Sequence, residues 1–128
     1  MNHLKKALHQ SWSIHSSTKW TADNPSKGQC GVTALVVQDI KGGYILKTPC
    51  KEGWHFYNQL NGQRYDFTQE QFREPLHYAD ILSSREEAFM DTNKEQYEAL
   101  KKSVMAYFIH KNSFRKEHIN EKYSVFHC

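Results

Sequence analysis

Apolar residues at helical spacing indicate that the first part of the chain forms two helices joined by a polar loop. An amphipathic helix is predicted from Asn2 to His15, and a shorter, mostly buried helix from Cys30 to Ile40. Their apolar positions are Leu4, Ala7, Leu8 and Trp12 in the first helix, and Val32, Leu35, Val36 and Val37 in the second. The intervening stretch from Ser16 to Gly28 is polar and rich in turn-forming residues, so it is predicted to be a loop. Gly42-Gly43 ends the second helix.

The middle of the chain has the pattern of β-strands. Strands are predicted over Tyr44–Thr48, Trp54–Leu60 and Gln63–Thr68. Asn61-Gly62 joins the last two as a two-residue hairpin turn, because both central residues of such a turn adopt positive φ. Leu60 then lies opposite Gln63, and residues whose numbers sum to 123 face each other across the pair.

Three capping boxes predict where the later helices begin. Thr68-x-x-Gln71 opens a short helix that ends before Pro75, and Ser84-x-x-Glu87 opens another. Thr92-x-x-Glu95 opens a long helix to about His110, with an apolar face formed by Tyr97, Leu100, Val104 and Phe108. This order of elements predicts an α+β fold, in which N-terminal helices pack on a small antiparallel sheet and a long C-terminal helix follows.

Length and composition predict one folded domain. The 128 residues are enough to bury a hydrophobic core that needs no disulfide bonds, so we expect a single domain over residues 1–128. The tail from Ser113 onward has no informative pattern. Hydrophobic residues make up 38% and charged residues 24%, a balance typical of folded, soluble proteins. The longest aliphatic run, Ala34–Val37, is far shorter than a membrane helix, and no signal peptide is visible. We therefore expect a cytoplasmic protein without membrane segments.

The distribution of charge argues against nucleic acid as a partner. The 17 Lys and Arg outnumber the 14 Asp and Glu, but the excess lies wholly in residues 93–128. It forms no basic stripe with stacking aromatic residues, so we expect no nucleic-acid binding.

The cysteines and four of the eight histidines lack the spacing of metal ligands. Cys30, Cys50 and Cys128 form no Cys-x-x-Cys pair, so at least one thiol is free and no metal or organic cofactor is expected. Cys50 and Cys128 have no base nearby in the sequence and are interpreted as incidental. The same absence of ligand spacing predicts surface positions for four histidines: His77, His110, His118 and His127.

Cys30 is the candidate nucleophile, because it opens a helix after the turn-rich loop Asn24–Gln29. The unpaired N–H groups and the positive dipole end of a helix favour a thiolate, which predicts a lowered pKa for Cys30. The same N–H groups could hold the oxyanion that forms when a carbonyl is attacked. The alternative interpretation is that Cys30 is a small, buried apolar residue.

His55 and Asp66 are the candidate base and orienting carboxylate. In the predicted register His55 faces Thr68, which makes His55 and Asp66 diagonal neighbours on one face of the hairpin. We expect a hydrogen bond between them, with the other ring nitrogen of His55 facing Cys30. Asn58 lies an odd number of residues from His55 and so points to the opposite face. The three residues then have the order and roles of a catalytic triad, and the alternative is a surface histidine beside an ordinary aspartate.

Five short segments carry a family resemblance: Asn-Pro-Ser-Lys-Gly-Gln-Cys at 24–30, Thr-Ala-Leu-Val-Val-Gln-Asp at 33–39, Gly42-Gly43, His-Phe-Tyr-Asn at 55–58, and Asp-Phe-Thr-x-Glu-Gln-Phe at 66–72. They resemble the YunG-like family of small bacterial proteins over about residues 12–110. Gly28-Gln29-Cys30, His55-x-Tyr57-Asn58 and Asp66-x-Thr68 are also similar to three blocks of the transglutaminase-like, papain-type cysteine enzymes.

The wider resemblance implies a papain-like fold with Cys30 as nucleophile, His55 as base and Asp66 as orienter. It also implies an oxyanion or substrate-binding role for two neighbours, Gln29 beside the nucleophile and Tyr57 at a position where the histidine block has Trp. The sequence departs from the transglutaminases after the nucleophile, where Cys30 is followed by Gly31 instead of Trp.

These residues together predict cysteine-dependent acyl chemistry through Cys30, His55 and Asp66. The expected reactions are amide hydrolysis, deamidation or acyl transfer on a small amide or a protein side chain. A non-catalytic module that binds a peptide or metabolite on the same fold is one alternative, and a structural partner of another protein is a second. Trp12 and Trp20 are expected to pack over the hydrophobic core. The alternative is that they form a wall of the substrate cleft. The pattern predicts neither the substrate nor the oligomeric state.

Overall fold

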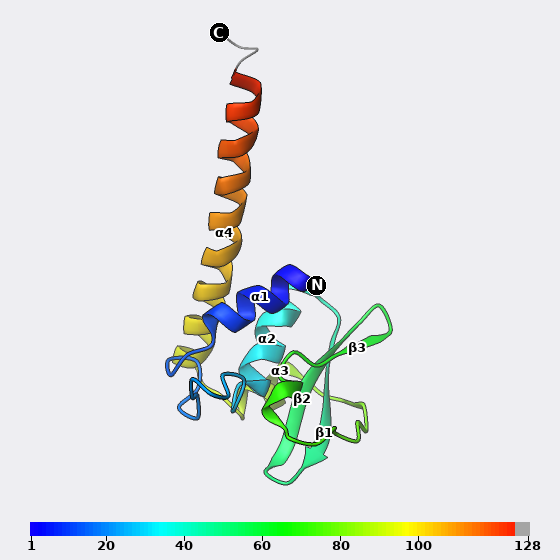
Figure 1. The fold of residues 1–128 in the computed structure, drawn as a ribbon. Coiled ribbons are helices and arrows are strands. Elements are labelled where there is room, and N and C mark those ends of the chain that lie inside the picture. Colours follow the sequence, from blue (N-terminus) through cyan, green and yellow to red (C-terminus); the bar gives the residue numbers. More distant parts are fainter. Residues whose placement is uncertain (125–128) are drawn as a thin grey trace.

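The computed structural model describes the backbone of residues 1–124 and the side chains of residues 1–111. Two helices come first, followed by the strands and then by a second pair of helices (Figure 1). The helices are α1 (Asn2–Ser11), α2 (Cys30–Lys41), the 3-10 turn η1 (Gln69–Gln71), α3 (Arg85–Phe89) and α4 (Lys94–Ser124); the strands are β1 (Tyr44–Cys50), β2 (Gly53–Leu60), β3 (Gln63–Tyr65) and β4 (Ile81–Leu82). The predicted α+β class, with N-terminal helices, a small antiparallel sheet and a long C-terminal helix, is confirmed.

The four strands form one antiparallel sheet in the order β3-β2-β1-β4. Within the β2–β3 hairpin, Leu60 pairs with Gln63, so the predicted register is confirmed. Asn61 and Gly62 have φ values of 52° and 77°, the positive values that a two-residue hairpin turn requires. This register positions the site, because β2 carries His55 and β3 leads directly into Asp66.

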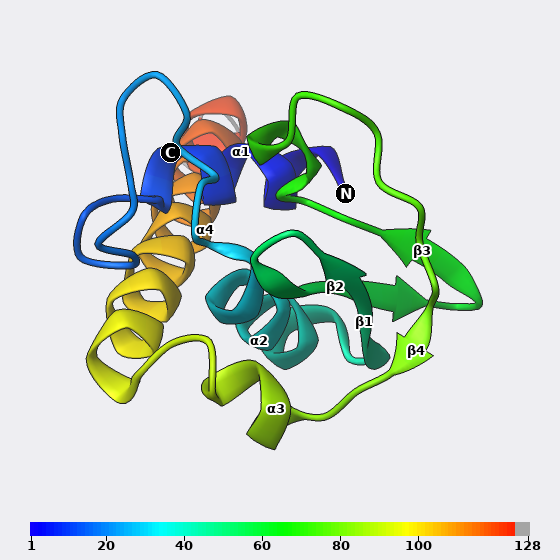
Figure 2. The ribbon, with the colours of Figure 1, turned by 90° about the horizontal axis from the view of Figure 1, so that it is seen from below.

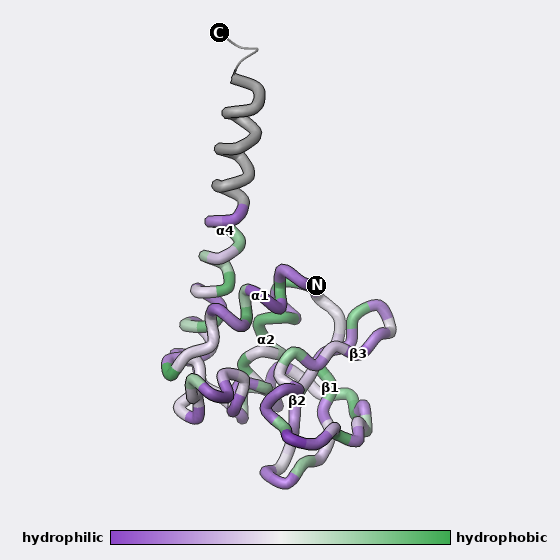
Figure 3. Tube along the Cα trace, viewed as in Figure 1, coloured by the Kyte–Doolittle hydropathy of each residue, from purple (hydrophilic) through white to green (hydrophobic). Residues whose placement is uncertain are grey.

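Helix α2 is the centre of the fold, because it lies between the sheet and the α1–α4 pair (Figure 2). Towards α1 and α4 it joins an apolar cluster made up of Leu4, Ala7, Leu8, Trp12, Val32, Val36, Val37, Leu60, Leu100 and Val104. Towards the sheet and α3 it joins a second cluster, Cys30, Ala34, Leu35, Ile45, Phe56 and Ala88. Figure 3 shows the apolar stretch along α2 that these contacts bury. No helix in the described residues is both long enough and apolar enough to cross a membrane.

The face of the sheet away from α2 is covered by the extended segment 72–80. Tyr78 of this segment packs edge-on against Tyr57 of β2, with ring centroids 5.0 Å apart. The hydroxyl of Thr48 on β1 exchanges two hydrogen bonds with the backbone of the segment, each of 2.9 Å. The segment thereby buries Thr48, Tyr57 and His55, whose side chains point to the face opposite α2.

Helix α1 is shorter than the apolar spacing predicts. It ends at Ser11 instead of His15, and Trp12 takes an extended ψ of 132°. The N–H of Ser13 then donates to the hydroxyl of Ser16 at 2.9 Å. Local side-chain bonds of this kind compete with helical ones and turn the chain.

Helix α4 is longer than predicted and begins from a different cap. Asn93, and not Thr92, accepts a hydrogen bond from a first-turn amide, that of Gln96, at 2.9 Å. The backbone remains helical to Ser124, beyond the predicted end near His110. The apolar stripe used for the prediction ends at Phe108, so it placed the end of the helix near His110.

Strand β3 ends at Tyr65 instead of the predicted Thr68, because Asp66 turns the chain. The Asp66 carboxylate accepts from the N–H of Thr68 at 3.1 Å, a local bond that replaces pairing in the sheet. The predicted cap of α3 is confirmed, since the Ser84 hydroxyl accepts from the N–H of Glu87 at 3.2 Å. Strand β4 was not predicted, because two residues are too few to show an alternating pattern.

Candidate functional site

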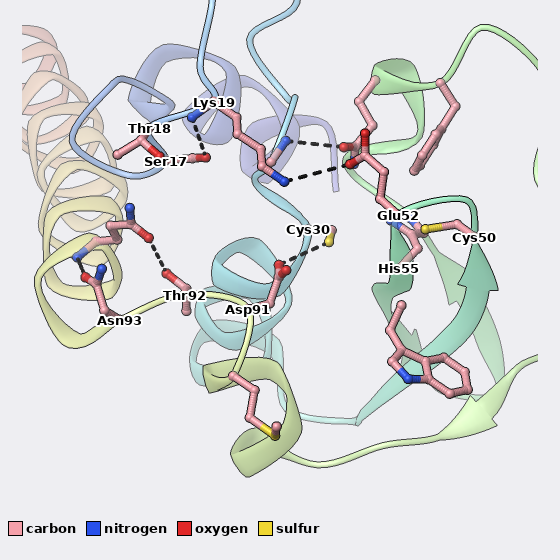
Figure 4. A pocket seen from close by; sticks show the side chains of 16 residues that line it. Ser17, Thr18, Lys19, Cys30, Cys50, Glu52, His55, Asp91, Thr92 and Asn93 are labelled. Carbon is pink, nitrogen blue, oxygen red and sulfur yellow. Dashed lines mark hydrogen bonds and ion pairs between the residues drawn. The ribbon is translucent and has the colours of Figure 1, made fainter.

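A pocket of about 260 Å³ opens where α2 begins, and it contains two of the predicted site residues (Figure 4). Cys30 at the start of α2 and His55 on β2 both line it. The rest of the lining comes from the loop before α2, the adjoining ends of β1 and β2 with their turn, the end of η1, and the α3–α4 turn with the start of α4: Ser17, Thr18, Lys19, Gly28, Cys50, Glu52, Trp54, Gln71, Phe72, Met90, Asp91, Thr92, Asn93 and Gln96. The pocket is therefore largely polar and carries side chains of both charge signs.

His55 and Asp66 are hydrogen-bonded, as the strand register predicts. His55 Nε2 lies 2.7 Å from Asp66 Oδ2, and the two side chains are 1% and 3% exposed. Asp66 follows β3 directly, so the diagonal placement across the hairpin brings its carboxylate to the imidazole. Asn58 points the other way, where its amide donates to the Ala34 carbonyl of α2 at 3.0 Å. The structure thus places Asp66, and not Asn58, against the ring.

Two residues that the sequence patterns did not single out for this purpose hold Asp66 in place. Thr68 donates to Asp66 Oδ1 through its N–H at 3.1 Å and its hydroxyl at 3.3 Å, and the Tyr78 hydroxyl donates to Oδ2 at 2.8 Å. Burial and the bond to Asp66 raise the pKa of Tyr78, so its hydroxyl remains a donor. Tyr78 lies in a segment without regular periodicity, and no sequence signal connects it with Asp66.

The His55 ring is packed by aromatic neighbours and keeps one nitrogen unpaired. Phe72 meets the ring edge-on at a centroid distance of 4.8 Å, and Tyr57 stacks on it at 5.8 Å. The other ring nitrogen, Nδ1, is buried and has no hydrogen-bond partner within the part of the chain that the structure describes. Because buried polar atoms are normally paired, this nitrogen is a candidate to accept a proton or to bind a ligand.

Tyr57 supports the site from behind and does not line the pocket. Its hydroxyl donates to the Asp80 carboxylate and accepts from the Asp80 N–H, each at 2.9 Å. Burial and the bond to Asp80 raise the pKa of Tyr57 to about 12. Arg64 holds the same carboxylate through bonds of 2.8 Å and 2.5 Å, and it lowers the pKa of Asp80. The structure therefore does not bring Tyr57 to the substrate-binding place that the family resemblance implies.

Gln29 precedes Cys30 in the sequence but lies outside the pocket lining. It is fully buried, and its amide donates to the Ser13 carbonyl at 3.4 Å. This bond ties the loop before α2 to the chain that follows α1, so the structure does not place Gln29 where an oxyanion would form. Trp12 and Trp20 likewise pack on the apolar core, as expected.

Cys30 is held as a thiol by a residue from another element. Its Sγ donates to Asp91 Oδ2 at 3.3 Å, and the Gly31 N–H donates to the same oxygen at 3.1 Å. Cys30 is 8% exposed, and burial, followed by the negative charge of Asp91, raises its pKa well above the ordinary value. The prediction of a lowered pKa is therefore wrong for this arrangement. A helix end favours a thiolate only where no other anion already occupies its N–H groups.

Asp91 lines the pocket and is hydrogen-bonded to Cys30, and the sequence patterns did not single it out. It lies in the turn between α3 and α4, where its N–H donates to the Ala88 carbonyl at 3.1 Å. Gly31 makes the close contact possible, because a Cβ there would lie 2.7 Å from Asp91 Oδ2 and 2.8 Å from the Ala88 carbonyl oxygen. Asp91 as a whole is exposed, but desolvation of its carboxyl group against α2 raises its pKa. No spacing rule connects Asp91 with Cys30, so only tertiary packing could reveal the contact.

A second cysteine reaches the same pocket. Cys50, interpreted as incidental from its sequence position, ends β1 and contributes to the lining. Cys30 and Cys50 are both free thiols. Cys128 and His127 lie outside the described residues, as does the side chain of His118. Among the described residues, no three His, Cys, Asp or Glu side chains are grouped so as to hold a metal ion.

Comparisons with known proteins cover most of the chain. Residues 1–109 match the protein family described as YunG protein, a range that includes every residue lining the pocket. A relative from Bacillus subtilis (strain 168), named Uncharacterized protein YunG, is 59% identical over 117 residues, which cover 91% of this chain and 99% of the relative. No solved structure matches the chain.

Proposed function

Because the chain belongs to the YunG family, whose name specifies no reaction, we propose its function from the pocket itself. The proposed function is cysteine-dependent acyl chemistry, meaning amide hydrolysis, deamidation or acyl transfer, on a small amide or an amide on a protein. Cys30 acts as the nucleophile, His55 as the base, and Asp66 as the carboxylate that orients the base. The proposal includes a papain-like arrangement, in which a cysteine at the start of a helix faces a histidine on a strand.

One observation carries the proposal: His55, whose imidazole is held by the buried carboxylate of Asp66, lines the same pocket as the helix-start Cys30. An ordinary surface histidine would not be 1% exposed and bonded to a carboxylate that other side chains also hold. The unpaired Nδ1 of His55 supports a role in which a proton or a ligand completes its hydrogen bonding.

In the proposed reaction, the Cys30 thiol gives its proton to His55 Nδ1 while Sγ attacks the carbonyl carbon of the substrate. The carbon–nitrogen bond then breaks, and the imidazolium gives the proton to the departing amine or ammonia. Water, or an amine in the transfer reaction, attacks the resulting thioester and loses a proton to His55. That proton returns to Sγ when the acyl group leaves. Asp66 accepts the Nε2–H hydrogen bond of His55 throughout and stabilises the imidazolium.

His55 acts as a general base during the attack in this scheme, and not as part of a preformed ion pair. Burial and Asp91 raise the pKa of Cys30, so the resting nucleophile is a neutral thiol. A neutral nucleophile can react when an adjacent base removes its proton as the new bond forms, which is how serine nucleophiles are activated.

A non-catalytic binding module is the second candidate, and one observation favours it. The Cys30 thiol is buried and already donates to Asp91, as expected of a cysteine that serves only for packing. In this function the pocket holds a peptide or metabolite through His55 Nδ1 and the polar side chains around it, and no thioester forms.

Acylation by p-nitrophenyl acetate, a small activated acyl donor, separates the two candidates. The enzyme is expected to release a burst of p-nitrophenolate as Cys30 is acetylated, and peptide mass spectrometry locates the acetyl group. Cys30→Ser should abolish the thioester, and His55→Ala should slow its formation about 100-fold, a typical contribution of a general base. Asn58→Ala is the matched control, because Asn58 is buried on the opposite face of the same strand, and it should leave the burst rate unchanged.

Equal acetylation of Cys50 and Cys30 would contradict the enzyme function, as would a Cys30 rate that does not respond to His55→Ala. Either result would leave the binding module as the function of the pocket.

A further inference from the structure

One carboxylate oxygen occupies the start of α2. Asp91 Oδ2 accepts hydrogen bonds from Cys30 Sγ at 3.3 Å and from the Gly31 N–H at 3.1 Å, and Figure 4 shows the first of these bonds within the pocket. A substrate carbonyl would need the same two groups, the sulfur to attack its carbon and a free helix-start amide to hold its oxygen. Asp91 therefore blocks the nucleophile and an oxyanion donor with a single atom.

The packing of α3 on α2 holds Asp91 in this position. Ala88 of α3 is fully buried against α2, and Arg85 donates to Gln38 of α2 at 3.0 Å. Asp91 follows in the next turn. Gly31 has no side chain, and this leaves the space that the Asp91 carboxylate fills, because a Cβ at Gly31 would lie 2.7 Å from Asp91 Oδ2.

The pocket also contains a polar atom that this contact does not satisfy. His55 Nδ1 belongs to a side chain that is 1% exposed, lines the same pocket, and has no partner among the described residues. A cluster with a purely structural role would be expected to pair this nitrogen. The Cys30 thiol donates its hydrogen bond to Asp91 instead. His55 Nδ1 would gain a partner if the thiol turned towards it.

We infer that Asp91 is an internal plug that the substrate displaces. The acyl oxygen of the substrate takes the Gly31 N–H from the Asp91 carboxylate, and the released thiol turns its proton to His55 Nδ1. One acceptor replaces another at Gly31, so no proton is gained or lost in the exchange. The exposed position of Asp91 lets the displaced carboxylate move into water, on the side of Lys19. This inference rests on the function proposed above and adds a control step to the same pocket.

Alkylation of Cys30 by iodoacetamide tests the plug without any acyl chemistry. Asp91→Asn removes the charge and keeps the shape, and Asp91→Ala removes the contact. Both are expected to increase the labelling rate of Cys30 at neutral pH by at least about tenfold, the change in thiolate population that one pKa unit produces. Glu52→Gln is the matched control, because Glu52 lines the same pocket but pairs with Lys19 at 3.8 Å, and it should leave the rate unchanged.

A Cys30 labelling rate equal to the wild-type rate in both Asp91 variants would overturn the plug. An equal increase in Glu52→Gln would also overturn it, because the effect would then come from the general charge of the pocket. A thermal melt shows whether each variant is folded, and if Asp91→Ala is not, Asp91→Asn alone decides.

The acyl donor used above distinguishes a plug from a catalytic carboxylate. If Asp91 is a plug, Asp91→Asn lowers KM and speeds acetylation of Cys30. If the Asp91 carboxylate instead takes part in the reaction, the same variant has a lower kcat, and that result would overturn the inference. Faster alkylation of Cys30 in the Asp91 variants, without acetylation in any protein, would refute the acyl chemistry and retain Asp91 as the group that covers the thiol. The two failures are therefore distinguishable.

Discussion

Replacing Asp66 by alanine removes one acceptor from several donors at once, so a large loss of stability is expected. The ring N–H of His55 and the N–H of Thr68 both belong to buried residues, and an unpaired buried donor costs about 1–3 kcal/mol. The hydroxyl of Tyr78 is only half-buried and can reach water, so it adds less. We expect Asp66→Ala to lower the free energy of unfolding by about 4 kcal/mol, out of a typical total of about 5–15 kcal/mol.

Asp66→Asn keeps the shape of the side chain and separates the hydrogen bonds from the charge. The amide oxygen can still accept from Thr68, and the amide nitrogen can donate to the Tyr78 hydroxyl. His55 must then present Nε2 as an acceptor, which moves its proton to Nδ1. We expect a stability loss of about 1–2 kcal/mol together with loss of the acetylation burst, because a protonated Nδ1 cannot act as the base.

Urea unfolding followed by tryptophan fluorescence measures both losses, and an unchanged m-value shows that the extent of unfolding is the same. For a chain of this length, a loss of about 4 kcal/mol corresponds to a fall in Tm of about 10–15 °C. Tyr78→Phe is the matched control, since it removes one half-exposed donor and should cost about 1 kcal/mol. If Asp66→Ala cost no more than Tyr78→Phe, the carboxylate would not be the shared acceptor and the reasoning would be refuted.

Two further variants test the surroundings of the site. Arg64 lowers the pKa of Asp80 below its ordinary value of 3.8. The ion pair therefore stabilises the fold at pH values above 3.8, and this stabilisation is lost as the pH falls through the pKa of Asp80 in the folded protein. Arg64→Gln should therefore be less stable than wild type at neutral pH. The difference should be less than about 1 kcal/mol, because the Arg64 and Asp80 side chains are both partly exposed. A difference in stability that persisted in acid would contradict this explanation. Gly31→Ala should cost about 1–3 kcal/mol, since its Cβ would lie 2.8 Å from the Ala88 carbonyl oxygen, and it should speed alkylation of Cys30 by displacing Asp91. A Gly31→Ala protein with wild-type stability and labelling rate would show that α3 is free to move away.

Short-range patterns were sufficient to predict the elements that carry the site and the pairing of His55 with Asp66. Asn61-Gly62 sets the register of the hairpin, and the alternation of side chains along a strand then decides which residues share a face. The position of Cys30 at the start of α2 follows from the apolar run that comes after it. In each case the chain between the residues is too short and too regular to allow another arrangement.

Contacts between distant segments were decided only by the tertiary structure. Asp91 meets Cys30, and Tyr78 meets Asp66, across stretches of chain in which no periodic pattern connects the partners. Gln29, next to Cys30 in the sequence, lies outside the pocket for the same reason, because packing and not sequence distance orients its side chain. The contact with Asp91 also reversed the expected ionisation of Cys30, since desolvation and the nearest anion act on a thiol more strongly than the helix that it begins. The hairpin sequence alone determined which carboxylate meets the histidine, whereas the packing of α3 on α2 decided the protonation state of the cysteine.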